Sequence, residues 1–474
     1  MASKGFSGPV TAVLVGAGTR GRDAYGRYAE MHPDRLKFIA VAEPDVDKRH
    51  RFQEIHAIPD SMAFETWQEL FESSKGKLAE VAFICTPDRL HYEPALQALQ
   101  LDYHLVLEKP IAPTVEECQG IARLAAEKQR LVQVCHVLRF TEFWKKIKEI
   151  IDSGRIGKIV HYDHSENVEY WHFGHSYVRG PYKNKATSTP IVLAKTCHDL
   201  DLMFWILGEK AIDVESSGTI AHFRPENAPA GAPNRCTDGC PVEKECPWFA
   251  PRLYLTAEPL VRTGLHAPSR IIRNFTKWIL KSKAFIKFIA LFDKRAKKLL
   301  NWDEFPVTAI TNDFSVEGKM KALREGPFGV CVYHAGNDVP DHMVSTFTFL
   351  SGATGTITMH GFSEQDGREL RIFGTKGVLR GIFRQNRELI EVTDFRFENT
   401  QVVHEAGLTV NVHGGGDIGI MDAFTAVLLG EVPNDKGGIT DVQSAMESHY
   451  MGFAAEDARE QRAVLDIDSY RQAR

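Results

Sequence analysis

A short apolar run near the start of the chain leads directly into a glycine-rich turn. Residues 10–15 are mostly small or branched apolar side chains, Gly16-Ala17-Gly18-Thr19-Arg20-Gly21 follows at once, and a helical stretch extends through Glu30. A strand, then G-x-G-x-x-G, then a helix is the setting in which a parallel sheet holds a dinucleotide. The glycines permit a tight turn, close approach of a pyrophosphate and close helix packing, and the helix N-terminus offers free N–H groups. The pattern predicts a cofactor site formed by Gly16, Gly18, Thr19, Arg20 and Gly21.

A second predicted strand, residues 36–42, ends at Glu43. An acidic side chain at this point can accept hydrogen bonds from the adenosine ribose hydroxyls, and it repels a 2′-phosphate. Glu43 therefore favours NAD over NADP. A solvated loop glutamate is the alternative, and the intact series of strand, turn, helix, strand and acid favours the cofactor site.

Three further apolar runs, at residues 81–85, 105–107 and 131–134, read as buried strands that alternate with helices. Such alternation predicts a doubly wound parallel sheet. Open parallel sheets bind ligands at their carboxyl edge, so residues that directly follow these strands are candidates for the site. For the cofactor they are Thr86, Pro87, His91, Glu108 and Lys109, and for the substrate Arg139.

Lys109 is the candidate best suited to acid–base catalysis. It lies in Glu108-Lys109-Pro110, where a side chain leaves a buried strand and is poorly solvated. Desolvation or a neighbouring cation lowers a lysine pKa, which makes the amine usable as an acid or base. The alternatives are a surface lysine before a turn proline, and for His91 a residue that only caps a helix.

Composition limits the class of protein. A chain of 474 residues is long for one hydrophobic core, so two domains are expected. A net charge of −5 argues against a nucleic-acid partner. The start has no apolar signal core and no later stretch is long enough to span a bilayer, which predicts a cytoplasmic protein. In that compartment the eight cysteines are expected as thiols, or as ligands where they cluster.

These motifs resemble the Gfo/Idh/MocA family of nicotinamide-dependent oxidoreductases. The resemblance implies an α/β fold with a Rossmann domain, residues 1–137, and an α+β domain, residues 138–474, that carries a large, mostly antiparallel sheet. It also implies a homodimer or homotetramer formed through the outer face of that sheet. The residues that carry the resemblance are Gly16-Ala17-Gly18-Thr19-Arg20-Gly21, Glu43, Thr86-Pro87 with His91, Glu108-Lys109-Pro110, and Gly154-Arg155-Ile156-Gly157-Lys158 at the entry to the second domain.

The residues after a predicted strand at 159–168 are dense in polar aromatic side chains. Residues 169–180 match neither a packing strand nor an amphipathic helix, and they suit a loop that presents rings and hydrogen-bond donors to a sugar-like ligand. A wet interface between subunits is the alternative. The substrate candidates here are Tyr170, His172, His175 and Arg179.

Apolar residues recur at helical spacing in residues 191–208. His198 and Asp201 lie three apart and share a face of that predicted helix, with Lys195 one turn earlier. By resemblance, His198 is the family's catalytic base or relay. From its position Lys195 is a further catalytic candidate, and Asp201 is a substrate candidate. The family pattern has an aspartate four residues before the histidine, whereas this chain has Ala194 there. A core histidine bonded to a backbone carbonyl is the alternative for His198.

An insertion at about residues 222–327 has no counterpart in the minimal family fold. It contains Cys236, Cys240 and Cys246, which are close enough in sequence to hold a structural zinc or iron–sulfur centre, with Cys331 the nearest fourth ligand. Three free thiols are the alternative.

Two other segments have open interpretations. Residues 270–298 carry ten basic residues and one acid among apolar ones, which suits a membrane surface or an acidic partner but more often marks a solvated face. His413-Gly414-Gly415-Gly416-Asp417 is a glycine loop that either closes over a ligand or is an ordinary turn.

Hydride transfer needs a nicotinamide that faces a C–H bond and a base for the adjoining hydroxyl proton. Lys109 and His198 are predicted to hold and deprotonate that hydroxyl, with help from Lys195. The first hypothesis is therefore an NAD-dependent oxidoreductase that acts on a ring hydroxyl of a sugar, glycoside or cyclitol. The second is an NAD-dependent glycoside hydrolase that works by oxidation, elimination, hydration and reduction. A third, an NAD- or sugar-sensing protein without catalysis, is disfavoured by the presence of both Lys109 and His198.

Overall fold

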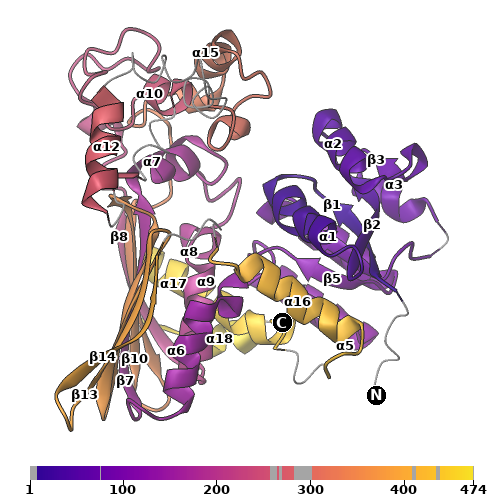
Figure 1. Ribbon diagram of the computed structural model, residues 1–474, viewed down its shortest axis with the longest axis vertical. Coiled ribbons are helices and arrows are strands. Elements are labelled where there is room, and N and C mark those ends of the chain that lie inside the picture. The colour runs from indigo at the N-terminus through magenta and orange to yellow at the C-terminus, as the bar shows by residue number, and fades with distance from the viewer. Residues whose placement is uncertain are drawn as a thin grey trace.

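Two sheets organise the chain, and a layer of helices lies between them (Figure 1). The computed structural model describes residues 8–74, 76–256, 264–265, 269–281, 302–407, 413–433 and 438–472.

The first sheet has six parallel strands in the order β3-β2-β1-β4-β5-β6. Both faces of its central strands are buried, which is why their sequences read as continuous apolar runs. The strand order reverses between β1 and β4 and so opens a crevice at the carboxyl edge. The predicted doubly wound parallel sheet is confirmed. Its strands are β1 Val10–Val15, β2 Leu36–Ala42, β3 Ala63–Phe64, β4 Val81–Ile84, β5 His104–Leu107 and β6 Val132–Val134.

Helices connect these strands. The predicted helix after the glycine turn is present as a π-helical segment, Arg20–Gly26, that continues as α1. Three other helices begin at a side chain that accepts a backbone N–H of the first turn, namely Asp45, Thr66 and Thr114. The helices are α1 Arg27–Met31, α2 Val46–His56, α3 Trp67–Glu72, α4 Tyr92–Gln100 and α5 Val115–Lys128.

The second sheet has nine strands in the order β14-β13-β12-β11-β7-β10-β9-β8-β15. Among the described strand pairs of this second sheet, only β7–β10 is parallel, so the predicted large, mostly antiparallel sheet is confirmed. Its strands are β7 Ile159–Glu169, β8 Ala211–Thr219, β9 His342–Phe349, β10 Thr354–Ser363, β11 Gly367–Gly374, β12 Gly377–Arg384, β13 Arg387–Asp394, β14 Asn399–Ala406 and β15 Leu465–Asp466.

Three predicted elements are divided differently in the structure. The strand-like stretch 347–359 is two strands, because Gly352 adopts a φ of 85° in the turn between them. The helix expected over 191–208 is interrupted after Ala194, so Lys195 does not continue the helical face of His198. The loop expected at 169–180 is mostly helical. Residues 169–180 contain α7 Tyr170–Phe173 and a π-helical segment, Gly174–Arg179. Residues 191–208 contain α8 Ile191–Ala194 and α9 Cys197–Leu207.

The layer between the sheets includes two helices from the C-terminal part of the chain, α16 Gly416–Leu428 and α17 Val442–Gln461 (Figure 1). Ile420 and Phe424 of α16 are buried in the same apolar cluster as residues of β1 and β2. The division into residues 1–137 and 138–474 stays a prediction, and α16 crosses it. The same layer contains α8 and α9 as well as α6 Glu142–Asp152 and α18 Asp468–Gln472 (Figure 1).

The insertion lies at one end of the large sheet (Figure 1). Its described helices are α10 Ala250–Leu255, α12 Arg270–Lys281 and α15 Val316–Glu325. Tyr254, Leu323 and Phe328 form a small apolar core with Trp171 of α7. The rest of the basic stretch, residues 282–298 beyond α12, lies outside the described residues. No helix in the described part of the chain is both long and apolar enough to cross a bilayer.

We expect Phe424→Ala to destabilise the first domain by about 3–5 kcal/mol, because it opens a cavity between α16 and the sheet. Phe424 is 1% exposed, whereas Phe397, the matched control, is 66% exposed. Phe397→Ala should change the free energy of unfolding by no more than about 0.5 kcal/mol. Denaturant unfolding measures both, and equal effects would show that α16 is not part of this core.

Candidate active site

The glycine turn has the shape that a dinucleotide needs. A Cβ at Gly16 would lie 2.7 Å from the carbonyl oxygen of Cys85, and a Cβ at Gly21 would lie 2.2 Å from that of Gly16. Both positions therefore require glycine. No atom lies within 4 Å of the Cβ position at Gly18, so the backbone there is open to a ligand.

A cleft of about 860 Å³ extends from this turn along the carboxyl edge of the first sheet. The loop at 181–188 of the second domain closes one side, and Ser188 and Thr189 donate hydrogen bonds to Asp88 across the gap. The cleft includes seven of the predicted cofactor residues, namely Gly16, Gly18, Thr19, Arg20, Glu43, Thr86 and Pro87. The donor set and the open glycine edge fit NAD.

Glu43 lies at the end of β2, as predicted. Its carboxylate accepts the N–H of Ala17 at 2.7 Å and the N–H of Asp45 at 3.0 Å, and the residue is 8% exposed. The glutamate therefore joins the cofactor cleft to the glycine turn, and the solvated-loop alternative does not describe it.

Arg20 connects the glycine turn to two other parts of the chain. It donates to Glu108 at 2.6 Å, to the hydroxyl of Tyr25 at 2.9 Å, and to Asp417 at 2.8 Å. Burial alone raises the pKa of Glu108, but Arg20 more than compensates and holds the pKa below its usual value. Glu108 is thus a charged partner of Arg20 at the edge of the site.

The side chain of His91 links two loops at the edge of the sheet. One ring nitrogen lies 2.8 Å from the carbonyl oxygen of Pro110 and the other 2.8 Å from that of Thr86. The ring therefore joins the two loops that follow β4 and β5. His91 also precedes α4, but its side chain makes no capping hydrogen bond.

Lys109 and His198 come together from the two domains. Nζ of Lys109 donates to the main-chain carbonyl of Ala194 at 2.8 Å. A backbone acceptor thus receives the lysine at the position where the family pattern has an aspartate. His198, in the first turn of α9, is buried and its Nδ1 has no hydrogen-bond partner among the described residues.

The protonation state of His198 follows from its surroundings. Burial lowers its pKa well below the usual value, and the charge of Lys109 lowers it further, as does His136. A buried histidine beside a cation is neutral at physiological pH and can accept a proton.

Lys195 belongs to a buried chain of charges. Its Nζ lies 2.8 Å from Glu166, which also pairs with Arg368 at 3.0 Å, and Arg368 donates to Asp199 at 2.6 Å. Burial alone lowers the pKa of Lys195, but Glu166, together with Tyr177 and Asp366, more than compensates and raises it. Lys195 is therefore held as a cation.

Arg139 and Asp201 bind each other. Two nitrogens of Arg139 donate to the two carboxylate oxygens of Asp201, at 2.6 and 2.5 Å. Arg139 and Asp201, two of the predicted substrate residues, thus form a bidentate ion pair with each other.

The four predicted residues of the 170–179 segment separate into two groups. Tyr170 begins α7, and His172 lies 3.0 Å from Asp366 at the end of the large sheet. His175 and Arg179 instead point into the insertion. His175 bonds to Tyr254 at 2.8 Å, and burial lowers its pKa to about 3.

Arg179 is almost fully buried. It donates to the carbonyl oxygens of Val330 at 2.7 Å and Trp248 at 2.8 Å. The guanidinium of Arg179 is therefore engaged at the insertion, and the structure does not bring it to the cleft.

The insertion cysteines are free thiols in the structure. Burial raises the pKa values of Cys246 and Cys331, which favours the protonated form. Arg179 also brings a guanidinium nitrogen 3.5 Å from the sulfur of Cys236, where a metal cation would be repelled. A centre at Cys236, Cys240 and Cys246 stays a prediction.

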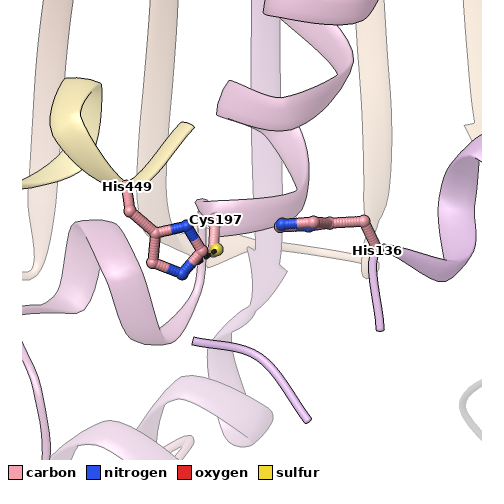
Figure 2. A group of neighbouring side chains, drawn as sticks. All are labelled: His136, Cys197 and His449. Carbon is pink, nitrogen blue, oxygen red and sulfur yellow. Dashed lines mark hydrogen bonds between the residues drawn. The ribbon is translucent and has the colours of Figure 1, made fainter. Parts of the chain in front are cut away.

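One other group has ligand atoms close together. In the described part of the chain, only His136, Cys197 and His449 place three such atoms within 4.8 Å of one another (Figure 2). However, Nε2 of His449 accepts the N–H of Ile111 at 2.9 Å, and Nδ1 lies 2.9 Å from the carbonyl oxygen of Ala445. Because both nitrogens are occupied, we assign the group to the packing between the domains.

Sequence reasoning missed several charged residues of the site. Glu166, Arg368 and Asp366 lie on or beside strands β7 and β11, which are adjacent in the sheet but far apart in sequence. A charged residue such as Glu166 within an otherwise strand-like run was the available signal. The predicted glycine loop does reach the site, since His413 lies 2.9 Å from Asp417 and its ring centre is 6.1 Å from that of His198.

Comparisons with known proteins agree with this geometry. Residues 10–136 match the oxidoreductase family with an NAD-binding Rossmann fold, and residues 144–251 match the GFO/IDH/MocA C-terminal domain. The oxidoreductase YteT of Bacillus subtilis is 24% identical over 205 residues, which cover 43% of this chain and 47% of YteT. Inositol 2-dehydrogenase of Salmonella typhimurium is 26% identical over 205 residues, 42% of this chain and 54% of the enzyme. The chain spans about half the length of the curated relatives it matches.

The solved structure of levoglucosan dehydrogenase with NADH and levoglucosan has the same fold. It superimposes with a TM-score of 0.62 and 15% identity, and the match covers 97% of this chain and 99% of that one. With both domain types matched and the cofactor cleft in place, the chain belongs to the Gfo/Idh/MocA family of NAD-binding oxidoreductases.

Proposed function

We propose that the protein is an NAD-dependent dehydrogenase that oxidises a ring hydroxyl of a sugar, glycoside or cyclitol. The observation that carries the proposal is the meeting of Lys109 and a neutral His198 from two domains beside the cofactor cleft. The inositol and levoglucosan dehydrogenases among the similar proteins support a polyhydroxylated ring as the substrate.

The residues divide the work of hydroxyl oxidation. NAD, held by the glycine turn and Glu43, supplies the hydride acceptor. His198 accepts the hydroxyl proton, because burial keeps its imidazole neutral. Lys109 is fixed by the Ala194 carbonyl and has further N–H donors that can hold the substrate oxygen.

Lys195 has a different role from the one that sequence reasoning favours. A lysine whose pKa is raised by a paired glutamate is a poor base. We infer that Lys195 and Arg368 instead orient substrate hydroxyls or hold the wall of the site. His172, which is paired with Asp366, is the remaining substrate candidate of its segment. A homodimer or homotetramer also stays part of this proposal.

Replacing Lys109 or His198 by alanine should lower turnover by about 10²–10⁴-fold, the range for loss of a positioned acid or base. NAD affinity should change little, since the glycine turn is untouched. Turnover is followed by nicotinamide absorbance over a panel of sugars and cyclitols, and NAD affinity by titration. Lys37→Ala and His50→Ala, both at exposed positions, are the matched controls. Normal turnover in both site variants would place the active site elsewhere.

The pH dependence tests the state of His198 separately. A protonated imidazole cannot accept the hydroxyl proton, so turnover is lost only as the pH falls through the pKa of this histidine. Because that pKa is lowered, the acid limb of kcat should lie below the ordinary histidine value of about 6.5. A limb at or above that value would contradict the assignment of His198 as the base.

The buried carboxylate of Glu43 should make NAD bind at least about tenfold more tightly than NADP, roughly 1.4 kcal/mol. A 2′-phosphate would lie against this charge, which is already held by the N–H groups of Ala17 and Asp45. Titration of the cofactor-free protein with both dinucleotides measures the ratio. Equal affinities would mean that Glu43 does not contact the adenosine ribose.

A further inference from the structure

The glycine loop at 413–417 is built to approach the active site closely. Gly414 and Gly415 have φ values of 57° and 85°, a region that favours glycine. A Cβ at Gly416 would lie 2.3 Å from the carbonyl oxygen of Val137, next to His136. The three glycines therefore let the start of α16 lie directly against the segment that follows β6.

This approach places His413 beside His198. The two ring centres are 6.1 Å apart, and Nδ1 of His413 lies 2.9 Å from Asp417. Asp417 is also held by Arg20 at 2.8 Å. Burial alone raises the pKa of Asp417, but the hydrogen bond with His413 and the charge of Arg20 lower it below its usual range.

The ion pair with Arg20 fixes the tautomer of His413. A charged Asp417 accepts Nδ1–H, so Nε2 carries the lone pair. No side chain or main-chain group in the described part of the chain forms a hydrogen bond with Nε2. This is the arrangement of an oriented base, a histidine with a carboxylate behind it.

The other candidates for a second base are occupied. Lys195 is held as a cation by Glu166, and His175 is bonded to Tyr254 inside the insertion. His198 is needed for the hydroxyl proton. His136 also lies beside His198, with ring centres 5.8 Å apart, but it is only 1% exposed and its Nε2 faces Asp201 at 3.8 Å. His413 is the neighbouring histidine that is held by a carboxylate and has a side chain 27% exposed, so that a ligand can reach it.

We propose that His413, oriented by Asp417, is a second base that removes a proton from the ring carbon next to the oxidised one. The inference rests on the proposed dehydrogenase function. Loss of a hydride and a hydroxyl proton leaves a ketone, which acidifies the neighbouring C–H bond. That bond breaks, the proton goes to Nε2 of His413, and the electron pair moves into the carbonyl as an enolate. The ammonium of Lys109 is placed to stabilise the enolate oxygen.

The step has two outcomes, depending on the substrate. With a cyclitol ketone, the imidazolium returns a proton to carbon, and in D₂O it returns a deuteron. With a glycosidic oxygen on the next carbon, the enolate electrons instead break that C–O bond, and the departing alkoxide takes the proton from His413. The second outcome supports redox-neutral glycoside cleavage as an alternative activity of the same site.

The test supplies the ketone directly. NADH-loaded protein is incubated in D₂O with 2-keto-myo-inositol and, separately, with methyl 3-keto-β-glucopyranoside, and mass spectrometry measures deuterium at carbon and released methanol. Hydride transfer is measured in parallel as oxidation of NADH. We expect the wild-type protein to incorporate deuterium or release methanol, and His413→Gln to slow this by about 10²-fold or more. Single-turnover hydride transfer should change by less than about tenfold, since His198 remains.

Two further variants interpret the result. His161→Gln replaces a histidine that bonds to Thr354 in the large sheet and should leave exchange unchanged. Asp417→Asn keeps His413 but removes the negative charge beside it, so deuterium exchange should fall while NAD still binds. If His413→Gln does not fold, Asp417→Asn serves as the test in its place.

The outcomes separate this inference from the proposed function. If deuterium exchange depends on His413 but no hydride transfer is observed, the second base is retained and the proposed dehydrogenase function is refuted. Hydride transfer without exchange, or exchange that His413→Gln and Asp417→Asn leave unchanged, would refute the second base alone. Equal loss of both reactions in His413→Gln, with NAD affinity intact, would place His413 in the hydride step and overturn the proposal. Absence of both reactions in the wild-type protein would overturn both.

Discussion

The guanidinium of Arg20 is the contact on which the geometry of the site depends. It binds Glu108 after β5 and Asp417 at the start of α16, and it belongs to the glycine turn itself. Three segments that are far apart in sequence therefore share one half-buried cation. Loss of one partner would leave part of this charge uncompensated, at a cost that the exposed part of Arg20 reduces through solvent screening. The cofactor turn, the loop that carries Lys109 and the loop that carries His413 are held together for this reason.

Around Ala194 the chain differs from the family pattern in the charges near Lys109. An aspartate there would supply a negative charge to Lys109, and in this chain a main-chain carbonyl receives the lysine instead. The neighbouring Lys195 brings a positive charge, and Glu166 on β7 balances it. The wall of the site thus contains cations that are already compensated, and the proposed proton transfers are assigned to the histidines next to them.

The fold could be predicted because its signals are local. The glycine turn, the buried strands and the acid after β2 each lie within a few residues, and parallel strands put their exits at one edge. The meeting of Lys109 and His198 could be predicted only through the family resemblance, since no local pattern connects the two domains. The segment 169–180 shows the limit. Its polar aromatic residues suggested a ligand, but carbonyl groups of Val330 and Trp248 and the hydroxyl of Tyr254, all distant in sequence, bind Arg179 and His175 instead.

The position of α16 has a consequence for how the chain matures. Domains generally fold as units while synthesis proceeds, beginning with the N-terminal one. Here, Ile420 and Phe424 complete an apolar cluster whose other members include Val10, Leu14 and Phe38. A nascent chain that has emerged only as far as β6 has all six strands of its first sheet, but the apolar face beneath α16 is covered only in part, by residues such as Tyr28 and Phe52. That part of the face waits for the synthesis of strands β7 to β14, so the emerging protein depends on protection from aggregation until α16 arrives.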